Sequence, residues 1–190
     1  MDKFYMEDTL LYKKDPRSRL NMNAIAKGFA SDLVAEGLSR LGITDMLVEI
    51  GGEIVCKGVN PDGNPWKIGI DSPIDGNVHP GESIEVVIRL TDKALATSGN
   101  YRNFYIENGK KYAHTIDPRT GMPVLHNLLS ATVIADDCMS ADAYATAFMV
   151  MGLESSKSFL ESHPGLGAFL IYDENGVFKT YATNNILMNL

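Results

Sequence analysis

Residues 45–57, DMLVEIGGEIVCK, decide the fold. Asp45–Ile50 and Glu53–Lys57 are short segments rich in apolar residues that we interpret with a period of two, and only Gly51-Gly52 separates them. A period of two places successive side chains on opposite faces of a β-strand. A glycine pair allows the chain to bend tightly between such strands. The stretch therefore predicts two successive strands joined by a short turn, which favours an antiparallel sheet.

The same pattern extends along the chain. Further strands are predicted at Trp66–Asp71, Ser83–Leu90, Asn103–Glu107, Lys110–Ala113, Leu128–Ala135, Ala168–Asp173 and Val177–Ala182, with a strand or hairpin within residues 3–13. Asn60–Pro65 is a turn cluster, and Asn108-Gly109 suits a type I′ hairpin turn, in which both central residues have positive φ.

Helices are predicted at Ala24–Leu41, at Ser140 to about Met151 and at roughly Glu154–Ser162. In the first, three- and four-residue spacings place apolar residues on one helical face: Ile25, Phe29, Leu33, Val34, Leu38 and Leu41. Asn23 is its expected N-cap and Gly42 its stop, while Ser140 is expected to cap the second. The expected fold class is α+β, a mainly antiparallel sheet packed with a few helices in a single domain over residues 1–190.

Composition excludes several functional classes. The chain is 45% apolar and 22% charged, as in an ordinary globular protein, and no apolar run approaches membrane-spanning length. Its net charge of −7 comes without a basic stripe, which argues against a nucleic-acid partner. The two cysteines, Cys56 and Cys138, form no zinc or disulfide pattern and are expected to be buried thiols.

The first candidate site is NAIAKG, residues 23–28, where small residues and Lys27 stand at the start of a predicted helix. Unpaired amides and the helix dipole favour an anion such as a pyrophosphate there. The alternative is a capped surface helix with a solvated lysine.

The second is SADAYAT, residues 140–146, where Asp142 and Thr146 stand four residues apart on one helical face. A carboxylate and a hydroxyl suit an oxygen-liganded cation such as Mg²⁺. Alternatively, Asp142 interacts with the helix dipole and Thr146 bonds back to the preceding turn.

Three further motifs are placed at strand ends. His114 precedes a turn rich in Asp, Pro, Thr and Gly, and could accept a proton from an attacking hydroxyl or be a structural histidine. Gly51-Gly52 and Thr97-Ser98-Gly99 are either ordinary bends or places where the backbone approaches a ligand closely.

Taken in order, six segments resemble the ApbE family of flavin transferases: AIAKGFASD (24–32), LVEIGGEI (47–54), WKIGID (66–71), ATSGNYRNF (96–104), HTIDPRTGMPV (114–124) and SADAYATAFMVMG (140–152). The resemblance covers about residues 20–183. It implies a reaction in which FAD is cleaved at its pyrophosphate, AMP leaves, and FMN is joined by a phosphoester to a threonine of an acceptor flavoprotein.

The resemblance also implies residue roles. Asp142, Thr146 and the main-chain oxygen of Ala24 would hold Mg²⁺, and Lys27 would contact the pyrophosphate. His114 would activate the acceptor hydroxyl. The FAD site would be lined by Gly51, Gly52, Ser98 and Asp117.

Some features depart from the family pattern. Asn21 and Asn23 stand where Asp and Gly are common, and the family's long N-terminal segment is expected to be absent. These departures leave open a non-catalytic FAD-binding module. A Mg²⁺-dependent FAD pyrophosphatase stays open as well, because the same residues would serve hydrolysis and transfer. The resemblance implies a place on the periplasmic or cell-envelope side of the membrane, often through a lipid anchor, which we do not expect to find within Met1–Arg19.

Overall fold

The computed structural model describes residues 3–73, 81–100, 104–107, 110–113 and 115–187. The helices are α1 (Ala26–Arg40), α2 (Cys138–Met151), α3 (Leu153–Ser162) and the short α4 (Asn184–Leu187). The strands are β1 (Phe4–Glu7), β2 (Leu10–Lys13), β3 (Met46–Ile50), β4 (Glu53–Lys57), β5 (Trp66–Asp71), β6 (Ile84–Leu90), β7 (Lys93–Gly99), β8 (Phe104–Glu107), β9 (Lys110–Ala113), β10 (Leu128–Ala135), β11 (Gly167–Glu174) and β12 (Val177–Ala182).

A six-stranded sheet in the order β12-β11-β10-β7-β4-β3 forms the centre of the fold, and every neighbouring pair in it is antiparallel. The turn between β3 and β4 is Gly51-Gly52, as the opening stretch predicts, and Ile50 pairs with Glu53 across it. Strands β5 and β6 form a separate hairpin, as do β1 with β2 and β8 with β9. Asn108-Gly109, predicted as the β8–β9 turn, lies outside the described residues. The α+β prediction is confirmed.

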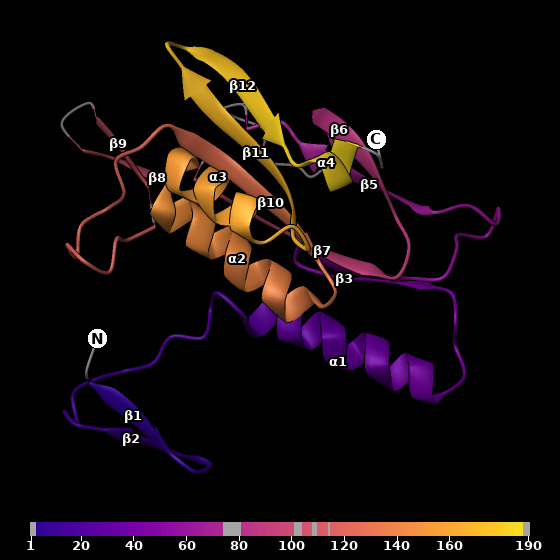
Figure 1. Ribbon diagram of the computed structural model, residues 1–190, viewed down its shortest axis with the longest axis horizontal. Helices are drawn as coiled ribbons and strands as arrows, with labels where there is room; N and C mark the ends of the chain where they lie inside the picture. The colour runs from indigo at the N-terminus through magenta and orange to yellow at the C-terminus, as the bar shows by residue number, and fades with distance from the viewer. Residues whose placement is uncertain (1–2, 74–80, 101–103, 108–109, 114, 188–190) are drawn as a thin grey trace.

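The two faces of the sheet are covered differently (Figure 1). On one face lie α1, α2 and α3, and Phe148 of α2 packs with Val133 of β10 and Leu170 of β11. The β5–β6 hairpin and α4 cover the other face, where Ile88 and Ile186 pack with Ile54 and Leu95. The central strands are therefore buried on both sides, and the molecule has three layers.

Helix α1 ends where the sequence predicts but begins differently. Gly42 has a φ of 86°, its N–H bonds to the Ser39 carbonyl, and the Ile43 N–H bonds to that of Leu38, which is a Schellman motif. The N-cap is Ile25 without a side-chain cap bond, so the prediction of Asn23 as N-cap is wrong. The side-chain oxygen of Asn21 instead accepts a bond from the Asn23 N–H, which engages this segment in a local turn.

The buried face of α1 is made of small residues, Gly28, Ser31 and Ala35. Phe29, Leu33 and Val34, which belong to the apolar stripe seen in the sequence, are about half exposed. The reason is the close crossing of α1 over the start of α2, where a Cβ at position 28 would lie 2.3 Å from the Cys138 carbonyl oxygen. Only small side chains fit such a contact.

Helix α2 begins at carboxylates rather than at the predicted serine. Asp137 is the N-cap and accepts a 2.7 Å bond from the Ser140 N–H, so the prediction of Ser140 as cap is wrong. Asp32 of α1 accepts the Cys138 and Met139 N–H groups, both at 2.8 Å. Free amides of the first turn are thus bonded by acidic side chains, which the helix dipole also favours.

The β1–β2 hairpin stands apart from the three layers, beside the N-terminal end of α1 (Figure 1). Apart from the half-buried Phe4, its strand residues are exposed, and Tyr5 stacks on Tyr12 at a centroid distance of 5.0 Å. Within the described part of the chain, no helix is both long and apolar enough to cross a membrane.

Candidate functional site

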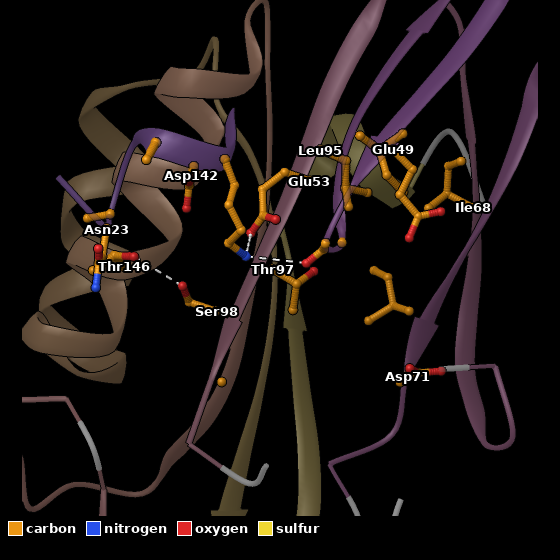
Figure 2. A pocket seen from close by; sticks show the side chains of 18 of the residues that line it. Asn23, Glu49, Glu53, Ile68, Asp71, Leu95, Thr97, Ser98, Asp142 and Thr146 are labelled. Atoms are coloured by element: carbon orange, nitrogen blue, oxygen red, sulfur yellow. Dashed lines mark hydrogen bonds and ion pairs between the residues drawn. The ribbon is translucent and has the colours of Figure 1, made fainter. Parts of the chain in front are cut away.

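A large open pocket of about 1220 Å³ lies between the helical layer and the β5–β6 hairpin. In Figure 2, Asp142 and Thr146 stand on one side of it, Glu49, Ile68 and Asp71 on the other, and the end of β7 with Ser98 between them. Its lining includes the candidate residues Ala24, Lys27, Gly51, Gly52, Ser98, Asp142 and Thr146. The fold thus brings together segments that are far apart in the sequence.

The start of α1 forms one wall. Ala24 and Lys27 line the pocket, and Lys27 reaches across to the strand layer. Its Nζ lies 2.5 Å from Glu53 Oε1 and 3.3 Å from the Gly51 carbonyl oxygen. Lys27 is about half exposed, so its ammonium is held by the protein but remains open to the pocket.

Asp142 projects from the second turn of α2 and is only 3% exposed. Its Oδ2 accepts a 3.1 Å bond from the Gly28 N–H, one of the free amides at the start of α1. One turn later, the Thr146 hydroxyl lies 3.1 Å from that of Ser98 at the end of β7. The fold therefore places a carboxylate and two hydroxyls together at the pocket wall.

These donors fit a hard divalent cation. Among the described residues no lysine or arginine forms an ion pair with Asp142, although a buried carboxylate strongly favours a compensating cation. No group of three or more His, Cys, Asp or Glu that could hold a metal occurs in the described part. The available set is the Asp142 carboxylate with the Thr146 and Ser98 hydroxyls, which suits Mg²⁺ because that ion keeps waters and phosphate oxygens as its other ligands.

The electrostatics of this wall centre on Glu53, which sequence reasoning missed. Burial raises the pKa of the Glu53 carboxyl, against the lowering effect of Lys27, and the nearby Asp142 carboxylate raises it further. Lys27 supplies one positive charge next to the carboxylates of Glu53 and Asp142. Their combined negative charge therefore favours a further cation in this region. The sequence signal for Glu53 was an acidic residue directly after Gly51-Gly52. The residue type alone does not show that the side chain is buried.

The Gly51-Gly52 turn requires glycine. Gly51 has a φ of 63° and Gly52 a φ of 101°, values that other residues adopt only rarely. A Cβ on Gly51 would lie 3.3 Å from Cδ of Lys27. The turn therefore fits closely under the lysine stem and lines the pocket with main chain.

The pocket is polar near the helices and apolar near the hairpin. Apolar side chains from the sheet and the hairpin cover the second part: Leu47, Ile54, Ile68, Ile70, Ile84 and Leu95. Around them stand the polar residues Glu49, Lys67 and Asp71. The arrangement suits an elongated ligand with a charged section and a flat apolar section.

Two candidate residues remain, His114 and Asp117. His114 lies outside the described residues, so its place in the site stays a prediction. Asp117 is described but is not among the pocket-lining residues; its carboxylate pairs with Arg119 at 2.9 Å, and this bond lowers the pKa of Asp117. Its neighbours Thr115 and Ile116 do line the pocket, which places this turn at the rim.

The chain is similar in sequence to known proteins. The model of the ApbE family matches residues 1–170. The chain is 40% identical to a FAD:protein FMN transferase of Vibrio cholerae over 181 residues, which cover 95% of this chain and 52% of that protein. It is 36% identical to the protein of the same name from Escherichia coli K12, over 90% of this chain and 47% of that one. The chain thus spans about half the length of these relatives.

Solved structures agree. The flavin transferase ApbE from Vibrio cholerae superposes with a TM-score of 0.86 and 37% identity, covering 99% of this chain and 58% of that one. The ApbE protein from Thermotoga maritima superposes with a TM-score of 0.81 and 26% identity, covering 98% and 59%. Sequence and structure lead to one assignment: the chain belongs to the ApbE family.

Proposed function

We propose that this pocket binds FAD and that the chain takes part in cleaving it at the pyrophosphate, releasing AMP and transferring FMN to a threonine hydroxyl of an acceptor flavoprotein. The observation that carries the proposal is the convergence of Lys27, the Gly51-Gly52 turn and the Asp142–Thr146 face on one pocket with an apolar extension. Relatives that bear the name FAD:protein FMN transferase support it.

The position of each residue in the pocket determines the role that we assign to it. Lys27 would bind a pyrophosphate oxygen through an N–H that faces the pocket, and the main chain of Gly51-Gly52 would let the dinucleotide approach closely. The apolar side chains near β5 and β6 would take a flat ring. Phosphoryl transfer depends on such positioning and on charge neutralisation more than on a strong nucleophile.

Asp142, Thr146 and the Ala24 carbonyl would hold Mg²⁺, which when bound neutralises charge on the phosphate oxygens. In the transfer itself, the threonine oxygen forms a bond to the FMN phosphorus while the bond from that phosphorus to the bridging oxygen breaks. That oxygen leaves with AMP. His114 would accept the threonine proton, as the family resemblance implies.

The test is incubation with FAD, with and without Mg²⁺, followed by chromatography for AMP and mass spectrometry of a threonine-containing acceptor domain. We expect metal-dependent AMP release and an FMN adduct on the threonine. AMP and free FMN without an adduct would support the pyrophosphatase instead. Tight FAD binding with no AMP in Mg²⁺ would support a binding module and contradict the proposed transfer.

A further inference from the structure

Glu53 is a buried carboxylate in the wall of the functional pocket, and the proposed chemistry gives it no role. Its residue is 2% exposed, and it is one of the largest fully buried side chains of the protein. Burying a carboxylate is costly unless it is paired and hydrogen-bonded. The position therefore needs an explanation beyond packing.

Both ends of Glu53 are tied to α1. Its main-chain oxygen accepts a 3.0 Å bond from the hydroxyl of Ser31, and its Oε1 lies 2.5 Å from Lys27 Nζ. Ser31 and Lys27 stand four residues apart, on neighbouring turns of the helix. Glu53 is the first strand residue after the Gly51-Gly52 turn. It thus links this turn to the start of the helix that carries Lys27.

Two bonds hold the ammonium of Lys27. A lysine ammonium has three N–H donors. One is directed to Glu53 Oε1 and one to the Gly51 carbonyl oxygen at 3.3 Å. Among the described residues these are its acceptors, so the third N–H is available to the pocket that Lys27 lines. An unbound lysine would move among many rotamers, whereas these two acceptors fix its charge in place.

We propose that Glu53 is a positioning residue, which holds the ammonium of Lys27 against the Gly51-Gly52 turn so that its remaining N–H points at the phosphate group of the ligand. The inference rests on the proposed function for the identity of that ligand. The geometry of the pair itself is independent of it.

The unpaired oxygen of Glu53 supports this role. Glu53 Oε2 is buried and has no hydrogen-bond partner in the described part of the chain. A buried carboxylate with one oxygen unbonded contributes little to stability, because its desolvation is only partly offset. The carboxylate is thus arranged to serve Lys27 rather than to complete a buried network.

The first experiment needs no ligand. Lys27 of the wild type and of Glu53→Gln is labelled with a limiting amount of acetic anhydride, and its rate is read by peptide mass spectrometry relative to Lys67, an exposed lysine of the same pocket. We expect labelling of Lys27 to rise by about threefold or more in the variant, because a charge-assisted bond to its nitrogen is lost. An unchanged ratio would overturn the proposal.

The second experiment measures coupling. FAD affinity is followed by flavin fluorescence in EDTA for the wild type, Glu53→Gln, Lys27→Met and the double variant. We expect about a fivefold loss for Glu53→Gln and about tenfold for Lys27→Met, with no further loss when the first is added to the second. Equal losses from Glu53→Gln in both backgrounds would overturn the proposal.

Glu49→Gln is the matched control, since Glu49 lines the same pocket and the substitution removes the same charge. Its effect on FAD affinity should be the same with and without Lys27→Met. If the wild type binds no FAD, the proposed function fails, and the labelling result alone decides the role of Glu53. Should Glu53→Gln not fold, Glu53→Asp retains the charge on a shorter stem, and its Lys27 labelling should also rise; no rise would contradict the proposal.

Discussion

Gly28 of α1 lies so close to Cys138 of α2 that a Cβ at position 28 would stand 2.3 Å from the Cys138 carbonyl oxygen and 2.8 Å from the Met139 Cα. Both neighbours are backbone, so neither can turn aside as a side chain can. The contact brings the Gly28 N–H to Asp142 and Asp32 to the first amides of α2. A helix crossing made possible by one glycine therefore builds part of the pocket.

Gly28→Ala should consequently destabilise the protein by about 1–3 kcal/mol, since the helices must separate to admit the methyl group. Gly37→Ala is the control within the same helix: nothing lies within 4 Å of its Cβ position. That change should be neutral or stabilise by up to about 1 kcal/mol through helix propensity. Urea unfolding measures both, and similar midpoints for the two variants would contradict the close contact.

The exposed apolar side of α1 gives a second prediction. Leu33 is 51% exposed and Ala35 is 2% exposed, although they lie only two residues apart. Leu33→Gln should change the free energy of unfolding by about 0.5 kcal/mol or less, whereas Ala35→Leu should cost about 1–3 kcal/mol by overpacking. Thermal melts compare them, and a large loss from Leu33→Gln would show that its side chain is buried in solution.

These two positions also show where sequence reasoning is limited. Strand alternation predicted β3 and β4 closely because their patterns are local, and Gly42 was found because its turn needs positive φ. The buried face of α1 was not predictable from hydrophobicity, since a close helix crossing selects small residues. Thr97-Ser98-Gly99 was placed after a strand, whereas it is the last part of β7, whose bounds were not predicted because KALATSG has little alternation. This strand lies at the centre of the sheet.

In the candidate site too, local motifs were predictable and distant contacts were not. Short motifs identified Lys27, Asp142 and Thr146 by residue type and spacing, and the pocket brings them together. Glu53 and Asp32 were missed because their importance depends on partners in distant segments, 26 and 106 residues away. Pairings of this kind exist only once the sheet and helices have assembled.

Asp142→Asn tests the cation site. We expect Mg²⁺ or Mn²⁺ affinity to fall by about tenfold or more, because the variant loses the only carboxylate of the proposed donor set. The amide oxygen can still accept the Gly28 N–H, so the fold should be retained. Asp136→Asn, in which an exposed carboxylate just before α2 is changed, is the control for net charge. Calorimetric titration that finds equal cation affinity in both variants would remove Asp142 from the site.

The raised pKa of Glu53 predicts a dependence of stability on pH. Between the ordinary value of 4.5 and the higher native value, the native state keeps a proton that the unfolded state has released. The stability of the wild type relative to Glu53→Gln should therefore fall as pH rises through this window, and level off above it. Urea unfolding from pH 4 upward measures the difference, with Glu49→Gln as the exposed control. A relative gain with rising pH would mean that the attraction of Lys27 outweighs burial.

The buried thiols report on the same helix contact. Burial raises the pKa of Cys56 and of Cys138 to about 12, and both residues are almost fully enclosed. Near pH 8 both thiols are therefore protonated and shielded, and a disulfide reagent should react with neither in the native protein but with both in guanidinium. Cys56→Ser assigns any remaining signal to Cys138. Because Cys138 lies beneath Gly28, the Gly28→Ala change should speed labelling of Cys138 more than that of Cys56, and equal acceleration of both would indicate global unfolding rather than opening of the α1–α2 contact.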